Sequence, residues 1–260
     1  MNSPIKWVGG KSKLAPKLIN LFPRHEGYVE VFAGSGAVLF AKSRSKWEVL
    51  NDFDSNLVNF WTVVKENYKE FIDSFDYTLV SREIFNRYKE KYKAGEYKDN
   101  IERAHIFYYL VKAGFGADMN SPCFGTGKDR NRLRIEDIEK DIKASYNRLK
   151  TVTIENDSFE NIIPRYDSPK TFFFMDPPYR NTKGYSTGDF TDEQYTLLRD
   201  LCKDMKGKFM ITINEDDFIK DLFQEFNILD HSVFYSMSKK EESRRQFGEL
   251  IITNYNPLNI

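Results

Sequence analysis

Four short runs of hydrophobic, β-favouring residues recur along the chain, and a polar or acidic residue lies at or near the end of each. The runs span residues 28–32, 48–52, 171–176 and 209–214. Their apolar character is continuous rather than alternating, which is typical of strands buried on both faces of a parallel sheet. Two further strands are predicted at residues 152–154 and 249–255, and the second of these is compatible with an antiparallel addition to the sheet.

Helical periodicity accompanies these strands at residues 12–21 and 191–205, as the alternation of an α/β fold requires. The middle of the chain differs, because helical patterns follow one another there around a glycine-rich polar loop at residues 114–131. The patterns cover residues 56–68, 82–93, 100–112 and 135–150. We therefore predict a mostly parallel α/β core formed by residues 1–56 and 151–260, with a mainly helical insertion formed by residues 57–150.

The composition indicates a globular protein, and the charge balance limits how it could bind nucleic acid. With 260 residues, 40% of them hydrophobic and 15% aromatic, the chain can form a sizeable globular core. Its 39 basic and 39 acidic residues exclude a uniformly positive surface but leave room for local basic faces at residues 112–134 and 239–245. Taken alone, the charges of these segments favour an ordinary solvated surface.

Membrane and metal chemistry are not expected. The longest purely apolar run, residues 172–175, is far too short to cross a bilayer, and residues 1–7 lack the layout of a signal peptide. Cys123 and Cys202 stand in no disulfide or metal-binding spacing. We expect a protein of a reducing, cytoplasmic compartment that has no metal site and does not bind membranes.

A glycine turn follows the first predicted strand. Glu30 closes this strand, and Gly34 and Gly36 follow it in the order Glu-Val-Phe-Ala-Gly-Ser-Gly. Glycines let backbone amides approach a ligand closely, and Asp52 at the end of the next strand is placed to bind the ribose hydroxyls of a nucleoside cofactor. Leu39 stands where dinucleotide binders have a third glycine, which disfavours a nicotinamide or flavin. A tight turn without a ligand is the alternative.

The most informative motif is Asp176-Pro177-Pro178-Tyr179, directly after a buried hydrophobic strand. Two successive prolines end the strand and form a rigid turn. Asp176 offers a carboxylate and Pro177 a backbone carbonyl, both of which can accept hydrogen bonds from an amino group. Tyr179 supplies an aromatic face on which a planar base could stack. The residues therefore indicate a binding site for the amino group of an aromatic base. The alternative is a strand that simply ends in a proline turn, with a tyrosine that has no function there.

Together with the Glu-x-Phe-x-Gly-x-Gly loop, this motif resembles the Dam-type (class alpha) DNA adenine-N6 methyltransferases. The opening Lys6-Trp7-Val8-Gly9-Gly10-Lys11 is similar to that family's first motif, and the order of the three motifs is the family's own. The resemblance covers residues 5–60 and 150–255. It implies a Rossmann-like core that binds S-adenosylmethionine, an inserted target-recognition domain, and double-stranded DNA as substrate in the cytoplasm of a bacterial or phage-infected cell.

The resemblance also assigns roles to individual residues. The cofactor contacts that it implies are made by Trp7, Gly10, Lys11, Glu30, Phe32, Gly34, Gly36, Asp52, Asp157, Phe159 and Asp176. The catalytic motif that it implies is Asp176, Pro177, Pro178 and Tyr179. Residues 249–255 resemble the family's closing strand, which we interpret as structural.

The insertion departs from the pattern of family members that recognise GATC. Only Phe124 and Gly125 keep clear register with their Phe-Asn-x-Pro-Phe-Gly segment, so the residues that read bases cannot be mapped. We still expect this region to recognise the target, with a monomer or weak dimer as the active form. The candidates for DNA contacts are Lys112, Asn120, Lys128, Arg130, Arg132 and Arg134.

The predicted chemistry is methylation of the exocyclic N6 amine of adenine, with the base flipped out of the duplex. Other amines, namely cytosine, an RNA base or a protein glutamine, are the nearest alternatives. A catalytically silent DNA-binding relative is an alternative from a different class. The intact Asp176–Tyr179 motif argues against a catalytically silent protein, because such a protein would not need hydrogen-bond acceptors for the target amine.

Overall fold

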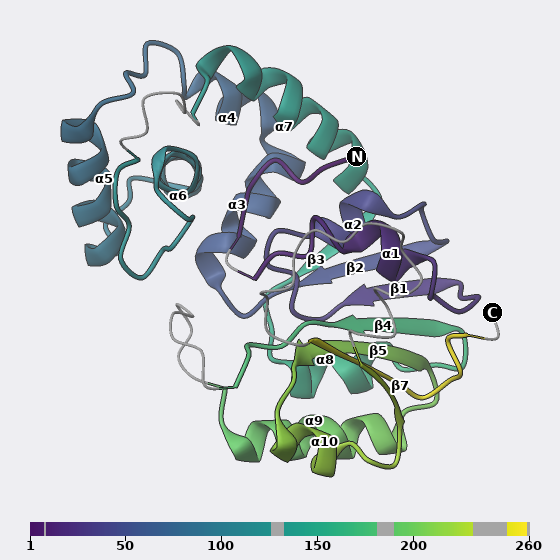
Figure 1. Ribbon diagram of the computed structural model, residues 1–260. Helices are drawn as coiled ribbons and strands as arrows, with labels where there is room; N and C mark the ends of the chain where they lie inside the picture. The colour runs from purple at the N-terminus through teal and green to yellow at the C-terminus, as the bar shows by residue number, and fades with distance from the viewer. Residues whose placement is uncertain (8, 126–132, 181–189, 231–248, 259–260) are drawn as a thin grey trace, which may run out of the picture. The chain divides into compact units, whose positions relative to one another are not determined.

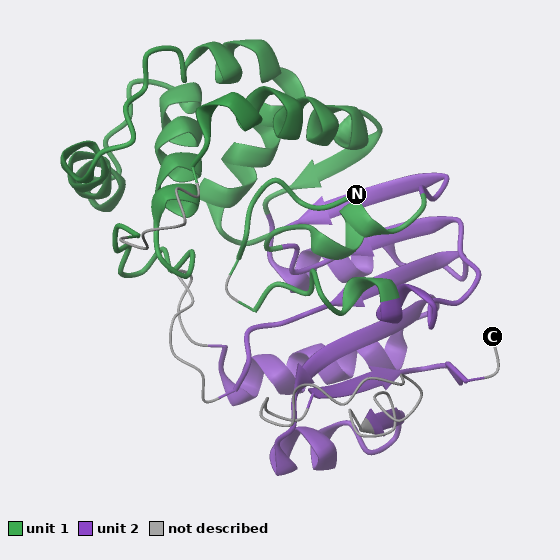
Figure 2. Ribbon diagram, turned by 45° about the horizontal axis from the view of Figure 1, so that its top comes forward, with its two compact units in different colours: residues 1–16, 34–43, 52–156 green, residues 17–33, 44–51, 157–260 purple. Residues whose placement is uncertain are grey.

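The computed structural model describes residues 1–7, 9–125, 133–180, 190–230 and 249–258 of the chain. Its contacts divide the chain into two compact units, coloured green and purple in Figure 2. Unit 1 comprises Met1–Pro16, Gly34–Ser43 and Asp52–Asn156, and unit 2 comprises Lys17–Ala33, Arg44–Asn51 and Asp157–Ile260. Each unit is therefore assembled from three separate stretches of sequence.

The strands form a seven-stranded sheet in the order β3-β2-β1-β4-β5-β7-β6. They are β1 (Gly27–Glu30), β2 (Trp47–Asn51), β3 (Val152–Glu155), β4 (Thr171–Met175), β5 (Lys208–Asn214), β6 (Asn227–Asp230) and β7 (Glu249–Thr253). The pairs β1–β2, β1–β4 and β4–β5 are parallel, whereas β7 runs antiparallel to β5 and β6. The predicted α/β fold with a mostly parallel sheet and an antiparallel last strand is confirmed.

One face of the sheet in unit 2 is covered by three helices (Figure 1), α8 (Phe159–Tyr166), α9 (Asp192–Asp204) and α10 (Asp217–Leu222). Alternate strand residues such as Val29, Phe173 and Ile211 form a core with buried helix residues such as Leu198 and Ile219. The start of α9 is fixed by a capping box between Thr191 and Gln194. The Asp216 side chain likewise caps α10.

Aromatic side chains surround Phe172 of β4, whose side chain lies on the opposite face of the sheet from Phe173. The ring of Phe172 lies 4.5 Å from Phe22, 6.1 Å from Tyr28 and 5.3 Å from His25, measured between centroids. Tyr255 meets Phe172 edge-on and donates its hydroxyl to the carbonyl of Leu21 at 2.8 Å. The strands are therefore buried on both faces, as their continuous apolar character indicated.

Unit 1 contains the helix-rich middle of the chain. Its helices are α2 (Ala37–Ala41), α3 (Ser55–Glu66), α4 (Tyr68–Asp73), α5 (Arg82–Ala94), α6 (Asn100–Ala113) and α7 (Ile135–Leu149), while α1 (Ala15–Ile19) runs from unit 1 into unit 2. α6 packs against α3 and α5, and Phe60 of α3 lies 5.7 Å from the ring centroids of both Phe107 and Tyr108. The four predicted helices are present. The role of residues 57–150 as an inserted target-recognition domain stays a prediction.

Some short elements had no sequence signal. α2, α4 and α10 contain only five or six residues, so they are too short for a full amphipathic period. The helix predicted at residues 12–21 is shorter in the structure, where α1 spans only Ala15–Ile19 and the Leu14 and Ala15 N–H groups close a turn on the carbonyl of Lys11 before it. Within the described ranges, no helix combines the length and the apolar character that crossing a bilayer requires.

Candidate active site

The glycine loop lies between β1 and α2, in a conformation that needs glycine. Gly34 and Gly36 have φ angles of 49° and 63°, in the left-handed region that side chains rarely adopt. A Cβ on Gly34 would stand 2.9 Å from Cδ1 of Trp7, which is too close for an ordinary contact. The indole of Trp7 therefore packs directly on the glycine backbone, and the opening motif and the glycine loop form one structure within unit 1.

Asp52 joins this loop to the end of β2. Its Oδ2 accepts the Gly34 backbone N–H at 2.8 Å, and its Oδ1 accepts the Asp54 N–H at 2.9 Å. Burial raises the pKa of the Asp52 carboxyl to about 6, although these backbone bonds oppose the shift. The carboxylate that we assign to the ribose hydroxyls is thus held in place by the glycine loop itself.

The remaining residues of the opening motif form a turn beside the loop. The Gly10 N–H bonds to the Trp7 carbonyl at 3.0 Å, and a Cβ on Gly10 would come within 3.4 Å of the Ser35 hydroxyl. Lys11 is 4% exposed, and its Nζ donates to the Gly9 carbonyl at 3.4 Å. A buried ammonium close to the glycine loop fits the cofactor role that the resemblance implies, since it favours an anionic ligand group.

In unit 2, Glu30 and Phe32 occupy the end of β1 and the turn after it. Glu30 is 2% exposed, and its Oε2 accepts the Tyr28 hydroxyl at 2.7 Å. Phe32 lies 5.8 Å from Phe159 and 5.8 Å from Phe190 between ring centroids. The acidic residue is therefore preoriented by its own strand, and the phenylalanine belongs to an aromatic cluster at the start of α8.

Asp157 makes two kinds of contact next to this cluster. Its backbone N–H and carbonyl pair with the Asn51 side chain at 3.0 Å each. Its carboxylate accepts bonds from Asn161 and Arg165 at 2.8 and 2.7 Å, and these bonds lower its pKa. The carboxylate thus stabilises the first turns of α8. A cofactor role for Asp157 stays a prediction, and its oxygens already serve α8.

The candidate catalytic turn, residues 176–179, follows β4. Asp176 is half-buried, and its Oδ1 accepts the hydroxyl of Thr212 on β5 at 2.9 Å. Pro177 is buried, whereas Pro178 and Tyr179 are partly exposed. The strand pair β4–β5 therefore positions the carboxylate, because Thr212 fixes its rotation about the last side-chain bond.

Tyr179 is held at the far end of its side chain. Its hydroxyl donates to Oε1 of Glu249, the first residue of β7, at 2.6 Å. A charge-assisted bond of this kind is stronger than one between neutral groups. The ring of Tyr179 therefore has a defined orientation beside the proline turn.

The structure describes three of the six candidate DNA contacts. Lys112 at the end of α6 donates to the Pro4 carbonyl at 3.2 Å, and burial lowers the pKa of its ammonium. Asn120 is exposed, and Arg134 is exposed and pairs with Glu136 and Asp137. Lys128, Arg130 and Arg132 lie outside the described residues, as does the basic segment at residues 239–245. DNA binding by all six residues stays a prediction.

Among the described residues, sequence reasoning missed three side chains that contact the candidate catalytic turn. Thr212, Glu249 and Tyr195 bond to Asp176, Tyr179 and the Pro178 carbonyl, respectively. They lie on other strands or helices, 36, 70 and 17 residues away along the chain. Phe53, directly after Asp52, is also notable, since 63% of this large apolar side chain is exposed next to the proposed ribose ligand.

Comparison with known proteins agrees with this arrangement. A type II methyltransferase of Lactococcus lactis, M1.LlaDCHI, is 28% identical over 96% of this chain and 94% of its own length. The type II methyltransferase M.CviBI of Paramecium bursaria Chlorella virus NC1A is 29% identical, covering 87% of this chain and 88% of its own. A DNA adenine methylase of Haemophilus influenzae is 25% identical, over 95% of this chain and 91% of its own.

The family profile covers most of the chain as well. Residues 7–237 match the family described as D12 class N6 adenine-specific DNA methyltransferase. This span includes the opening motif, the glycine loop, the carboxylate after β2 and the proline turn after β4. The motif alone left cytosine, an RNA base and a protein glutamine as alternative targets, and the family match selects the N6 amine of adenine in DNA. The chain belongs to the D12 class of N6 adenine-specific DNA methyltransferases.

Proposed function

We propose that the chain methylates an adenine flipped out of duplex DNA, with S-adenosylmethionine as the donor and Asp176, Pro177, Pro178 and Tyr179 as the catalytic group. The observation that supports this assignment best is the oriented carboxylate at the tip of β4. Thr212 donates to Asp176 Oδ1 at 2.9 Å, and a buried proline follows it in the chain. A fixed acceptor next to a rigid backbone carbonyl is what an amine with two N–H donors requires.

The chemistry explains why two acceptors are needed. The lone pair of an aromatic exocyclic amine is delocalised into the ring, so the amine is a weak nucleophile. Hydrogen bonds from its two N–H groups to Asp176 and to the Pro177 carbonyl favour a tetrahedral nitrogen, whose lone pair is localised. Asp176 need not remove a proton before attack, because the nitrogen becomes acidic once it is methylated. The residues contribute through positioning and charge stabilisation.

The residues of the glycine loop fit S-adenosylmethionine in this proposal. When bound, the cofactor supplies an electrophilic methyl group on a sulfonium. Gly34 has a positive φ, and Trp7 occupies the place of its missing side chain, so the loop is held in one conformation against the opening motif. Asp52 accepts the ribose hydroxyls, Glu30 holds the positive methionine end, and Lys11 contributes its buried ammonium. The further contacts that we propose come from Gly10, Phe32, Gly36, Asp157, Phe159 and Asp176.

Tyr179 stacks on the flipped adenine in this proposal. Taking a base out of a duplex costs a few kcal/mol, and stacking on an aromatic ring recovers about 1–3 kcal/mol of it. The hydrogen bond from Tyr179 to Glu249 holds the ring in one orientation, so less conformational entropy is lost when the base arrives. Pro178, whose ring fixes its φ angle, limits the rotations between Asp176 and Tyr179.

Lys112, Asn120, Lys128, Arg130, Arg132 and Arg134 are proposed to contact the DNA, and a monomer or weak dimer is proposed as the active form. The type II methyltransferases among the relatives support a role in DNA modification.

Transfer of a labelled methyl group tests the proposed function. Purified chain and labelled S-adenosylmethionine are incubated with duplex and with single-stranded DNA, and the digested nucleosides are separated. We expect the label in N6-methyladenine, with duplex DNA as the better substrate. Label in N4-methylcytosine or in RNA would contradict the proposal, and better transfer to single strands would contradict base flipping from a duplex.

A further inference from the structure

The catalytic turn has little rotational freedom of its own. The rings of Pro177 and Pro178 fix the φ angles of both residues. A residue before a proline is held in the extended region, and this restricts Asp176 and Pro177 in turn. The first unrestricted rotation after the strand is therefore ψ of Pro178. That rotation sets the plane of the peptide between Pro178 and Tyr179, and hence the direction in which the Tyr179 ring leaves the turn.

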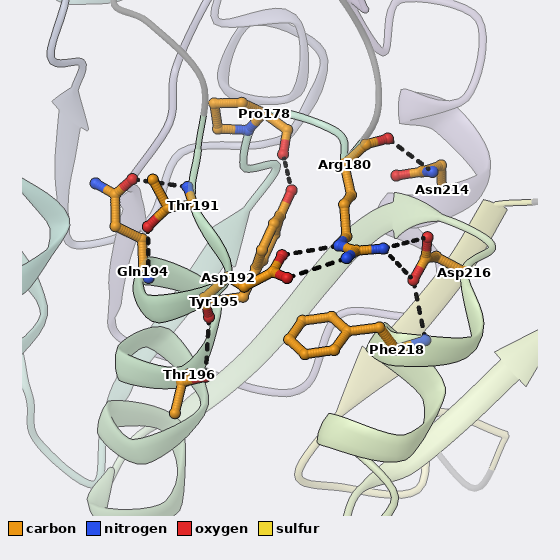
Figure 3. A network of polar contacts seen from close by, with 10 residues as sticks. All are labelled: Pro178, Arg180, Thr191, Asp192, Gln194, Tyr195, Thr196, Asn214, Asp216 and Phe218. Atoms are coloured by element: carbon orange, nitrogen blue, oxygen red, sulfur yellow. Dashed lines mark hydrogen bonds and ion pairs between the residues drawn. The ribbon is translucent and has the colours of Figure 1, made fainter.

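Tyr195 of α9 holds this peptide plane. Its hydroxyl donates to the Pro178 carbonyl at 2.5 Å, as Figure 3 shows. The Tyr195 side chain is 0% exposed and belongs to the core between α8, α9 and the sheet. A buried hydroxyl that lost this acceptor would be left without water to replace it, so the bond resists opening. Because the Pro178 carbonyl already accepts the bond from Tyr195, the Pro177 carbonyl is the acceptor that remains for the adenine amine in this proposal.

Arg180 secures the other side of Tyr179. Its Nε and Nη2 meet both carboxylate oxygens of Asp192 at 2.8 and 3.0 Å, and its Nη1 lies 3.2 Å from Asp216 Oδ2. The guanidinium also lies over the Phe218 ring, 4.7 Å from its centroid. In addition, the Arg180 carbonyl accepts a bond from the Asn214 side chain at 3.3 Å. Figure 3 shows these contacts converging from the starts of α9 and α10.

The partners of Arg180 are themselves anchored. Asp192 is the first residue of α9, directly after the capping box of Thr191. Asp216 is the N-cap of α10, where Oδ1 accepts the Phe218 N–H at 2.9 Å. A bidentate pair between arginine and carboxylate fixes direction as well as distance. The backbone on both sides of Tyr179 is therefore tied to α9 and α10, two of the three helices that cover this face of the sheet.

We propose that Tyr195 and Arg180 are positioning residues for methyl transfer, which set the direction of Tyr179 without contacting the substrate. This inference rests on the proposed function of the Asp176–Tyr179 motif. The rate of methyl transfer then depends on Tyr195 and Arg180, two residues outside that motif. Misplacement of a reacting group by about 1 Å can lower a rate by about a hundredfold.

Tyr195→Phe tests the proposal, because it removes the hydroxyl and keeps the ring in the core. Tyr255→Phe is the matched control, since it removes a bond from another tyrosine to a backbone carbonyl, that of Leu21, within the same unit. Loss of either bond should lower the free energy of unfolding to a similar extent. We expect Tyr195→Phe to slow single-turnover methyl transfer at least about tenfold, with unchanged binding of cofactor and DNA, whereas Tyr255→Phe keeps the wild-type rate.

Further measurements separate positioning from stability and from failure of the site assignment. Fluorescence of 2-aminopurine at the target position reports base flipping, and we expect Tyr195→Phe to flip the base yet transfer slowly. Arg180→Lys keeps the charge but loses the bidentate pair, and should slow transfer in the same way. If Asp176→Ala is inactive while Tyr195→Phe and Arg180→Lys transfer at the wild-type rate, the positioning proposal is wrong and the site assignment stands. An active Asp176→Ala variant would instead overturn the proposed function.

Discussion

The hydroxyl of Thr212 donates to Oδ1 of Asp176 at 2.9 Å, across the neighbouring parallel strands β4 and β5. Thr212 is 1% exposed, so the bond is made in the absence of competing water. It fixes the plane of the carboxylate that we assign to the adenine amine. The position of this acceptor is therefore a property of the sheet as much as of the proline turn.

Thr212→Val tests this relationship, because valine keeps the shape of threonine but loses the donor. We expect methyl transfer to slow about tenfold, since the carboxylate can rotate away from the amine. Thr212→Ser retains the hydroxyl and should recover most of the rate. The control is Thr253→Val, which removes a similarly buried hydroxyl that donates to the Tyr255 carbonyl at 2.7 Å. Equal rates for Thr212→Val and Thr253→Val would contradict the role of Thr212.

Substitutions of Tyr179 distinguish stacking from hydrogen bonding. Tyr179→Ala should weaken binding of the flipped base by about 1–3 kcal/mol, because an aromatic face is lost. Tyr179→Trp and Tyr179→Phe keep such a face and should retain most of this binding. The phenylalanine variant also loses the bond to Glu249, so any remaining defect reports on ring orientation. The stacking role fails if the alanine and tryptophan variants bind the base alike.

Binding of S-adenosylmethionine should depend on pH through Asp52. Burial raises the pKa of this carboxyl to about 6 from its ordinary value of 3.8, so the group takes up a proton as the pH falls through 6. A protonated oxygen no longer accepts a ribose hydroxyl bond, and we expect affinity to fall about tenfold from pH 7.5 to pH 5. Calorimetric titration of wild type and Asp52→Asn measures this, and the variant should bind weakly at every pH. The same pH slope in both proteins would rule out Asp52 as the titrating group.

Stability should depend on pH through His105 in unit 1. The imidazole is 5% exposed, lies between the Ser74 and Tyr88 hydroxyls at 2.9 and 3.2 Å, and has a pKa lowered by burial to about 4. Below its ordinary value of 6.5 the unfolded chain binds the proton and the folded chain does not, so stability falls as the pH drops from 6.5 towards 4. The fall attributable to this group is on the order of 3 kcal/mol.

Urea denaturation of wild type and His105→Gln at several pH values isolates that contribution. The difference in unfolding free energy between the two proteins should shrink as the pH falls, because only the wild type has to keep a neutral imidazole buried. A difference that stays constant between pH 7 and pH 4 would show that His105 is protonated in the folded state as readily as in the unfolded one.

The buried strands were predictable because their signal is local. Each of the runs at β1, β2, β4 and β5 is continuous and apolar, and the parallel pairing follows from that pattern. The proline turn was equally predictable, since proline restricts the backbone whatever its surroundings. These local features suffice to place Asp176 and Tyr179 at the end of a central strand.

The contacts that orient these residues were not predictable, because they join distant parts of the chain. Thr212 and Glu249 look like ordinary strand residues, and Tyr195 looks like an ordinary core residue of an amphipathic helix. Their polar atoms gain a role only when the pairing of β4 with β5 and the packing of α9 bring them to the turn. The bonds of Asp157 to Asn161 and Arg165 were missed for a different reason, since a carboxylate that stabilises a helix start has the same sequence signature as one that meets a ligand.

The central claim is that Asp176 at the tip of β4 directs a methyl group to adenine N6. Its most direct test is sequencing that detects modified bases in DNA from cells that express either the wild-type chain or Asp176→Ala, with both proteins present in equal amounts. The account predicts N6-methyladenine in one defined sequence context with the wild type and no added methylation with the variant. Equal methylation by both chains would contradict it.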